Sequence, residues 1–273
     1  MRNCLAGPFI GEFGWELFCW QGFLRKRRPD YDSMTVICRK GHRVLYEDFA
    51  DEVIEIEIPT DSVDGWKNAG FDPHAVTNYY KANRGFTDFI PFDSYKYWWW
   101  AKPNAQIKQV FKPYGNCKSG LETDILMHIR CAHHAKSSYR NWAISSAYEY
   151  AKWALSNGYK LACIGKSDTS SYIPYDIIDC RDLPLESLVD IMASSRVLIG
   201  SQSGPFHLAA LCRLQMIAWQ QSQESADRLA KHWNPFNVNA WTHPGTGQRK
   251  RPRPSFVPSL EWMQRCTLEA LNA

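Results

Sequence analysis

The sequence of 273 residues lacks several features that would place it in a specialised class at once. It has no apolar run close to the ~20 residues needed to span a bilayer. Its first residues contain no long apolar segment of the kind found in signal peptides. It also has no internal repeat of fixed period and no low-complexity tract. We therefore expect a globular cytoplasmic chain without a transmembrane segment.

The sequence also lacks a convincing metal site. None of its nine cysteines stands in a C-x-x-C pair, and their odd number and apolar surroundings favour reduced, buried thiols. His128, His133 and His134 are close together, but no acid or thiol has ligand-like spacing beside them. Asp30 and Asp32 spell D-x-D before an expected strand, which favours a turn. We expect no metal and no cofactor.

Basic and aromatic residues are unevenly distributed, although the net charge is only +4. Two compact basic clusters occupy residues 25–28 and 249–253. Such clusters are often solvated helix ends or loops; alternatively, they contact a polyanion such as DNA, a phosphorylated glycan or an anionic membrane surface. Aromatic residues make up 14% of the chain, and their densest cluster is the Trp run 98–100. That run suits stacking on sugars or bases, or a wedge between domains.

Apolar segments of strand length alternate with helical patterns along most of the chain. We expect strands near residues 3–6, 34–38, 53–58, 124–129, 160–164, 197–199 and 216–219. We expect helices near residues 15–27, 42–49, 144–156, 185–193, 205–211 and 260–271. This alternation indicates an α/β fold with parallel sheets, whereas residues 60–102 show only weak periodicity. With a linker candidate at 115–120, it predicts Rossmann-like domains at 1–117 and 118–258.

The most informative segment is 197–211, which reads as a strand, a tight turn and the start of a helix. The apolar run ends at Gly200, and Pro205 stands where a helix would begin. Free N–H groups and the helix dipole at such a start form an anion site, typically for phosphate. Ser203 could cap the helix or donate to the phosphate, and His207 lies one turn further on the same face. The alternative is an ordinary junction with a packed histidine.

Polar residues follow other expected strands as well. The glycine-rich loop 7–14 follows the first strand but is not the G-x-G-x-x-G fingerprint. Glu12 or Glu16 could cap the helix that this loop opens. Arg130 follows a strand of the second half and suits bidentate contact with phosphate. Lys166 stands in a Gly-Lys-Ser turn without the rest of a Walker frame, and Asp182 could cap the helix expected at 185.

Residues 202–210 resemble the D-[ST]-G-x-x-H-x-A-A signature of GT-B glycosyltransferases of the ADP-heptose:LPS heptosyltransferase type (glycosyltransferase family 9). In that family the turn holds the phosphates of the donor, and its usual acid is Gln202 here. Residues 11–14 resemble the first loop of the family, G-[DE], and also the G-x-F-G-N-Q loop of GT-B fucosyltransferases. His128-Ile129-Arg130 is similar to the H-x-R donor-binding element of the fucosyltransferases.

The resemblance implies two Rossmann-like domains facing a cleft and a C-terminal helix, 259–273, packing back toward the first domain. It implies metal-independent, inverting transfer of a sugar from a nucleotide-diphosphate donor to a hydroxyl acceptor. Glu12 would be the catalytic base, and His207 would orient or neutralise the leaving phosphate. The donor-binding residues would be Arg130, Lys166, Asp182, Ser203 and Gly204. For the acceptor we expect Trp15, Trp99 and Arg249.

Two other functions are compatible with the sequence. The basic clusters and the tryptophans would suit a phage-type glycosyltransferase that acts on hydroxymethylated bases of DNA, where a flipped base needs an aromatic surface. A non-catalytic protein that binds a nucleotide-sugar or a nucleic acid could also keep this fold. A binder needs no carboxylate at Glu12, whereas an inverting transferase needs a base to remove the acceptor proton.

Overall fold

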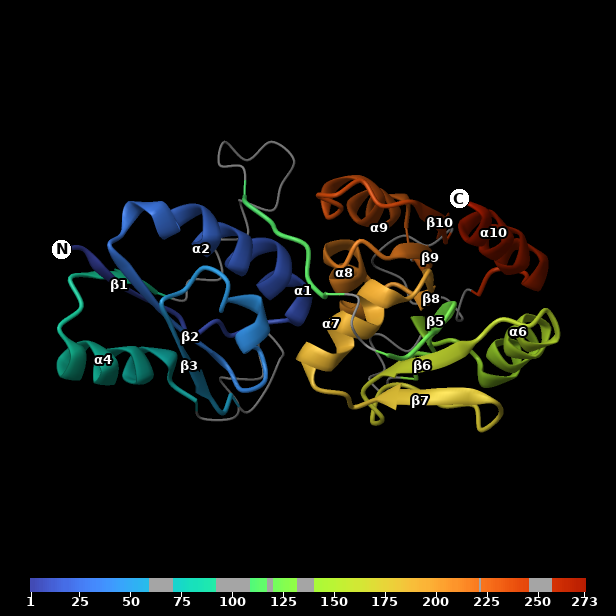
Figure 1. Ribbon diagram of the computed structural model, residues 1–273, viewed down its shortest axis with the longest axis horizontal. Coiled ribbons are helices and arrows are strands. Elements are labelled where there is room, and N and C mark those ends of the chain that lie inside the picture. Colours follow the sequence, from blue (N-terminus) through green and yellow to red (C-terminus); the bar gives the residue numbers. More distant parts are fainter. Residues whose placement is uncertain (59–70, 92–108, 117–119, 132–139, 221, 246–256) are drawn as a thin grey trace. The chain divides into compact units, whose positions relative to one another are not determined.

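The computed structural model describes residues 1–58, 71–91, 109–116, 120–131, 140–220, 222–245 and 257–273. The chain divides into two compact units, Met1–Lys112 and Pro113–Ala273, each built on its own parallel sheet (Figure 1). The sequence placed this division at 117/118. The two sheets and their covering helices confirm the expected α/β class with two Rossmann-like parts.

The sheet of the first unit has the strand order β3-β2-β1-β4. Its strands are β1 (Asn3–Ala6), β2 (Ser33–Arg39), β3 (Glu52–Ile56) and β4 (Asp88–Ile90), all parallel. A continuous helical segment connects β1 to β2 and consists of α1 (Phe13–Trp15), the π-helical η1 (Glu16–Gln21) and α2 (Gly22–Arg27). The other helical elements are η2 (Arg28–Asp30), η3 (Arg43–Leu45) and α4 (Pro73–Arg84).

One predicted helix of the first unit is wrong. Residues 42–49 form only the short 3₁₀ turn η3. Tertiary hydrogen bonds hold this connection instead: Arg43 donates to the carbonyl of Val53, and the Asp51 carboxylate accepts from the backbone N–H of Met34. These contacts override the local helical pattern. Helix α4 and strand β4, in the stretch of weak periodicity, were not predicted.

The sheet of the second unit has the order β10-β9-β8-β5-β6-β7, and all its strands are parallel. The strands are β5 (Ile125–His128), β6 (Leu161–Gly165), β7 (Ile177–Arg181), β8 (Val197–Ser201), β9 (Gln215–Gln220) and β10 (Ala240–Pro244). The helices are α6 (Ile144–Ser156), α7 (Leu185–Ser194), α8 (Gly204–Leu211), α9 (Gln223–Asp227), η6 (Arg228–His232) and α10 (Leu260–Asn272). All the strands and helices predicted for this part are confirmed, whereas β7, β10, α9 and η6 were not predicted.

The C-terminal helix α10 packs on the second unit. It contacts α6 and the strands β8 and β9, and the two helices lie side by side in Figure 1. Met263 and Cys266 of α10 join the core formed by Tyr150 of α6 and Trp219 of β9. A hydrogen bond of 2.8 Å between the Tyr150 and Thr267 hydroxyls closes this contact. We expected the helix to pack back toward the first domain; the packing described here is within its own unit.

Both sheets reverse their strand order beside their first strand. In the second unit the chain runs from β5 outward to β6 and β7, and then crosses to β8, β9 and β10 on the other side of β5. In the first unit β1 has β2 on one side and β4 on the other. Ligands of open α/β sheets bind at such a switch point, at the carboxyl ends of the strands. The loops after β1, β5 and β8 stand at these points.

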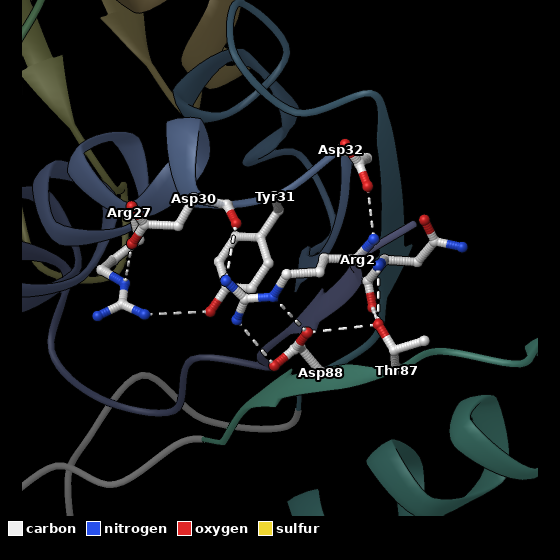
Figure 2. Close-up of polar contacts among 8 residues, drawn as sticks. Arg2, Arg27, Asp30, Tyr31, Asp32, Thr87 and Asp88 are labelled. Atoms are coloured by element: carbon white, nitrogen blue, oxygen red, sulfur yellow. Dashed lines mark hydrogen bonds and ion pairs between the residues drawn. The ribbon is translucent and has the colours of Figure 1, made fainter.

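The opposite edge of the first sheet carries a structural polar network (Figure 2). The Arg2 guanidinium donates two hydrogen bonds to the Asp88 carboxylate, and its backbone N–H donates to Asp32 at 2.6 Å. Asp30 forms an ion pair with Arg27 at 2.9 Å. These residues lie at the amino ends of the strands. Asp30 and Asp32 thus form an ordinary turn, as their sequence position predicted.

Candidate functional site

The turn between β8 and α8 closes onto the end of β5. Ser203 precedes α8 in an extended conformation, and its side chain makes no capping hydrogen bond. Its hydroxyl instead lies 3.0 Å from Nδ1 of His128, the last residue of β5, and 3.3 Å from the carbonyl oxygen of Ser201. Ser203 is thus the N-cap residue of α8, but the interpretation of its side chain as the cap is wrong. The first N–H groups of α8 are left without a side-chain cap, which suits an anion site.

Gly200 lets β8 and β5 approach each other at this point. Its φ is +155°, and a Cβ atom built there would lie 2.5 Å from the carbonyl oxygen of His128. Real Cβ atoms do not approach a backbone oxygen so closely, so a larger residue would push the strands apart. The glycine that ends the apolar run of the sequence is thus required by packing against His128.

Two buried histidines at this edge are neutral at pH 7. Burial lowers the pKa of His128 to about 4, with Arg130 and Arg140 contributing to the shift. Burial lowers the pKa of His207 to about 3, helped by Arg228 and Arg140. The imidazole of His207 can therefore hydrogen-bond to a phosphate but carries no charge with which to neutralise one.

Three arginines supply positive charge around these histidines. Arg130 is buried and donates to the Asn141 side chain at 2.7 Å. Arg140 donates to the carbonyl oxygen of Gln202 at 3.4 Å. The guanidinium of Arg228 lies 5.0 Å from the centre of the Trp233 ring, which in turn packs edge-on against His207 at 4.6 Å. Because the shifts of both histidines include these charges, the arginines create a positive field at the start of α8.

Two buried amides lie at the ends of β8 and β9. Gln202 is 6% exposed and Gln220 is 4% exposed. Within the part of the chain that the structure describes, Nε2 of Gln202 and both amide atoms of Gln220 have no hydrogen-bond partner. Ser201 pairs with Trp219 in the sheet, so the two glutamines stand at corresponding positions just beyond this pair. Gln202 replaces the acid of the family signature, and this position therefore adds no negative charge to oppose an anion.

Lys166 and Asp182 lie on the exposed loops after β6 and β7. Asp182 has a positive φ of 58°, and its carboxylate accepts a 3.1 Å hydrogen bond from the backbone N–H of Ser167. Hydrogen bonds from Ser167 lower the pKa of this carboxyl group. The residue before α7 is Pro184, so the interpretation of Asp182 as its N-cap is wrong. Asp182 instead ties the two loops together.

The loop after β1 presents Glu12 to solvent. Glu12 precedes α1, and its carbonyl oxygen accepts the backbone N–H groups of Trp15 and Glu16 at 2.9 and 3.2 Å. Its side chain makes no capping hydrogen bond, so the interpretation of Glu12 as a side-chain cap is wrong. The carboxylate is exposed at the carboxyl end of the sheet, while Trp15 is half-buried one turn later.

Glu16 is buried and has two partners that the sequence analysis missed. One carboxylate oxygen lies 2.8 Å from Nδ1 of His42, and the other accepts the Tyr46 hydroxyl at 2.7 Å. Burial alone would raise the pKa of Glu16, but His42 and Tyr46 hold it below its ordinary value. The carboxylate is therefore charged at neutral pH. In the sequence, only a histidine shortly after a strand hinted at this pair.

The basic cluster at 25–28 is engaged in ion pairs. Arg25 pairs with Asp48, Arg27 pairs with Asp30, and Arg28 pairs with Asp51 at 2.9 Å. Because these three guanidiniums are matched by carboxylates, the structure favours a stabilising role for the cluster over contact with a polyanion. Trp99, Arg249, His133 and His134 lie outside the described residues.

Among the residues placed by the structure, no group of three or more His, Cys, Asp or Glu side chains could hold a metal ion. Within the same residues, no helix combines the length and the apolar character needed to cross a membrane.

Sequence comparisons found no relative: no family model matches the chain, and no curated protein matches it. Solved structures do match. A glycosyltransferase of family 9 from Veillonella parvula has a TM-score of 0.64 at 14% identity, covering 99% of this chain and 97% of that chain. The E. coli heptosyltransferase WaaC with ADP has a TM-score of 0.61 at 10% identity, with coverages of 99% and 100%. E. coli ADP-heptose LPS heptosyltransferase II has a TM-score of 0.59 at 13% identity, with coverages of 98% and 99%. The chain therefore has the GT-B fold of the family 9 glycosyltransferases, as its short motifs predicted.

Proposed function

We propose that this protein is a glycosyltransferase that moves a sugar from a nucleotide-diphosphate donor to a hydroxyl group. The observation that carries the proposal is the positive, uncapped start of α8 at the switch point of the second sheet. There, Arg130 and Arg140 lie beside two neutral histidines, and the acid of the family signature is replaced by Gln202. A diphosphate is the anion that such a helix start and such guanidiniums bind well.

The donor phosphates would be bound by the N–H groups at Gly204, by the Ser203 hydroxyl and by Arg130. Lys166 on the loop after β6 would add a further positive charge. Structures similar to this chain include E. coli heptosyltransferase WaaC with ADP and with ADP-2-deoxy-2-fluoro heptose. We infer a nucleotide-sugar as the donor here, with Asp182 and its loop beside the nucleotide.

We infer that the reaction inverts the anomeric carbon and needs no metal. The acceptor oxygen would attack the anomeric carbon as the bond to the diphosphate breaks, while a base removes the hydroxyl proton. Glu12 is the base that the family resemblance implies, and its exposed, non-capping carboxylate is compatible with this role. The helix dipole and the arginines would stabilise the leaving diphosphate, and His207 would donate a hydrogen bond as a neutral imidazole.

The acceptor is proposed to be a glycan, with Trp15 as a stacking surface. The ion pairs of Arg25, Arg27 and Arg28 remove one of the two basic clusters that made DNA attractive as an acceptor. Trp99 and Arg249 remain predicted acceptor residues.

A thermal-shift panel of UDP-, ADP-, GDP- and dTDP-sugars tests the proposal. A ligand at about 100 times its Kd stabilises the folded state by about 2.7 kcal/mol, which raises the melting temperature measurably. We expect one nucleotide series to stabilise the protein, Arg130→Ala to lose this shift, and Glu12→Ala to keep it. Arg265→Ala, which removes an exposed arginine of α10, is the matched control. If no nucleotide-sugar stabilises the wild type, the proposal is wrong.

A further inference from the structure

A cluster of polar side chains stands at the ends of β8 and β9, beside the proposed phosphate contacts. Nη1 of Arg140, between β5 and α6, donates a hydrogen bond to the carbonyl oxygen of Gln202 at 3.4 Å. The backbone N–H of Gln202 donates to the carbonyl oxygen of Trp219 at 3.1 Å, which fixes this residue against β9. Gln220, the last residue of β9, completes the cluster. All of these residues belong to the second unit, so the cluster is defined within one sheet.

Gln220 lies on the face of the sheet that α8 covers. Trp219, the residue before it, packs in the core that α10 and α6 share. Because side chains alternate between the two faces of a strand, Gln220 belongs to the opposite face. Helix α8 contacts β9, and its Phe206 packs edge-on against His128 with their ring centres 6.5 Å apart. Figure 1 shows α8 and α10 on opposite sides of β8 and β9. The amide of Gln220 is therefore on the side of the sheet from which α8 starts.

Four buried atoms of this cluster have no hydrogen-bond partner among the described residues. They are Nε of Arg140, Nε2 of Gln202, and both Nε2 and Oε1 of Gln220. Three of these four atoms are hydrogen-bond donors, and leaving such atoms unsatisfied in a folded protein costs free energy. Arg140 and the turn 203–205 are half-buried, so they border the surface on which a ligand of this turn would lie. The missing partner is therefore a group rich in hydrogen-bond acceptors.

The cluster is also positively charged. Besides burial, the guanidinium of Arg140 lowers the pKa of both His128 and His207, so its charge acts on the whole start of α8. Both imidazoles are neutral and add no charge of their own. At the position of the acid in the family signature, this chain has the neutral Gln202. An acid at that position would offset the charge of Arg140, whereas an amide does not. The cluster therefore suits an anionic group better than a neutral hydroxyl group.

The order of the strands indicates which part of the sugar donor lies here. The loops of Lys166 and Asp182, proposed to lie along the nucleotide side of the donor, follow β6 and β7. The start of α8, proposed to bind the diphosphate, follows β8. In the order β10-β9-β8-β5-β6-β7, the cluster at β8 and β9 is on the side away from the nucleotide. Because the sugar is attached to the other end of the diphosphate, we expect the sugar at this cluster.

We propose that Arg140, with the amides of Gln202 and Gln220, binds a carboxylate on the transferred sugar. The substrate is then the nucleotide diphosphate of an acidic sugar of the uronic acid type. This inference rests on the proposed function and adds the class of sugar to it, while Glu12 stays the proposed base. An ionised carboxylate only accepts hydrogen bonds, at both of its oxygens, and so it matches guanidinium and amide N–H groups.

Matched pairs of nucleotide-sugars test the inference by calorimetric titration of the full chain. UDP-glucose and UDP-glucuronate differ only in a hydroxymethyl or a carboxylate group on the sugar, and the same pair is made with any other nucleotide that stabilises the wild type. We expect the acidic member to bind about tenfold more tightly or better, as for a charge-assisted hydrogen bond. Arg140→Gln should bring the ratio of the two affinities close to one. Gln202→Asp, which restores the acid of the signature, should reverse the preference.

Two further variants and the free nucleoside diphosphate serve as controls. Arg140→Lys keeps the charge and should keep part of the preference, which separates loss of charge from misfolding. Arg265→Gln, which changes an exposed arginine of α10, should leave the ratio unchanged. Affinity for the free nucleoside diphosphate reports the state of the phosphate site in each variant.

The outcomes separate this inference from the proposed function. If the wild type binds the neutral member as tightly as the acidic one or more tightly, the inference is wrong and the proposed function stands. If Arg140→Gln weakens both members and the free diphosphate equally, Arg140 binds the phosphates and the inference is again wrong. If neither member of any pair binds the wild type, the proposed function fails and the acidic sugar falls with it.

Discussion

The hydroxyl of Ser203 lies 3.0 Å from Nδ1 of His128, which joins the turn before α8 to the end of β5. His128 ends β5 and Ser203 lies in the turn after the adjacent strand β8, where Gly200 allows the close approach. The hydrogen bond gives a buried neutral imidazole a partner and fixes the serine against the start of the helix. It therefore couples the stability of this edge to the proposed phosphate site.

We predict that Ser203→Ala lowers the free energy of unfolding of the second unit by about 1 kcal/mol, the net value of a typical hydrogen bond. It should also weaken nucleotide-sugar binding, because the hydroxyl would face the phosphates. Urea unfolding and calorimetric titration measure the two effects. Ser156→Ala is the control, since it removes an exposed hydroxyl of α6 that donates to the carbonyl of Lys152 within its own helix. Equal effects of the two substitutions would contradict the prediction.

The neutral histidines predict that the second unit loses stability in mild acid. His128 and His207 have folded pKa values of about 4 and about 3, below the ordinary 6.5, so the unfolded chain binds protons first as the pH falls. Their stabilising contribution is present above pH 6.5 and is lost as the pH falls from 6.5 toward 4. The free energy of unfolding should therefore fall by at most about 1.4 kcal/mol per pH unit for each histidine.

Hydrogen exchange of the β8 amides between pH 7 and 5 measures this slope once the intrinsic exchange rates are corrected. His128→Asn and His207→Asn should each flatten it. His243→Asn serves as the control, because it removes a partly buried imidazole of β10 that packs against Trp262. A pH dependence unchanged in both test variants would contradict the prediction. It would mean that the two histidines bind protons alike in the folded and the unfolded chain.

The sequence predicted the second unit better than the first, for physical reasons. Strands such as β8 and helices such as α6 are marked by buried apolar runs and by periodicity, and these signals are local. The first unit instead depends on contacts between distant residues. Arg43 and Asp51 hold the turn that we predicted as a helix, and no local pattern indicates them.

The sequence predicted the site residues that lie in strand-end loops, but it did not predict which residues of the site are partners. Ser203 and Arg130 were found because they follow apolar strands. The partnership of Glu16 with His42 requires β1 beside β2, and the correspondence of Gln202 with Gln220 requires β8 beside β9. Such pairs depend on sheet order, which the alternation of strands and helices does not specify.

The ion pairs of the first basic cluster predict that it does not bind DNA. In the double variant R27A/R28A, duplex DNA affinity and its salt dependence should equal those of the wild type. Stability of the first unit should fall instead, because Arg28 also donates to the carbonyl oxygen of Phe49. Fluorescence anisotropy at several salt concentrations measures the first effect. A slope of log K against log salt that becomes shallower by about 2 would show two lost phosphate contacts and contradict the prediction.

The buried amide of Gln202 predicts that its removal affects the stability of the protein and the affinity for the nucleotide-sugar in different ways. Its Nε2 is buried without a hydrogen-bond partner among the described residues, and an unsatisfied buried donor costs about 1–3 kcal/mol. Gln202→Met keeps the length and removes the polar atoms, so the free energy of unfolding should stay equal or rise. If the amide serves the donor, nucleotide-sugar affinity should nevertheless fall. Gln215→Met, at the other end of the neighbouring strand β9, is the control: its amide donates to the carbonyl of Ala270 at 2.9 Å, so its loss should destabilise the protein and leave binding unchanged. A Gln202→Met variant that is less stable but binds normally would assign the amide a structural partner and remove it from the donor site.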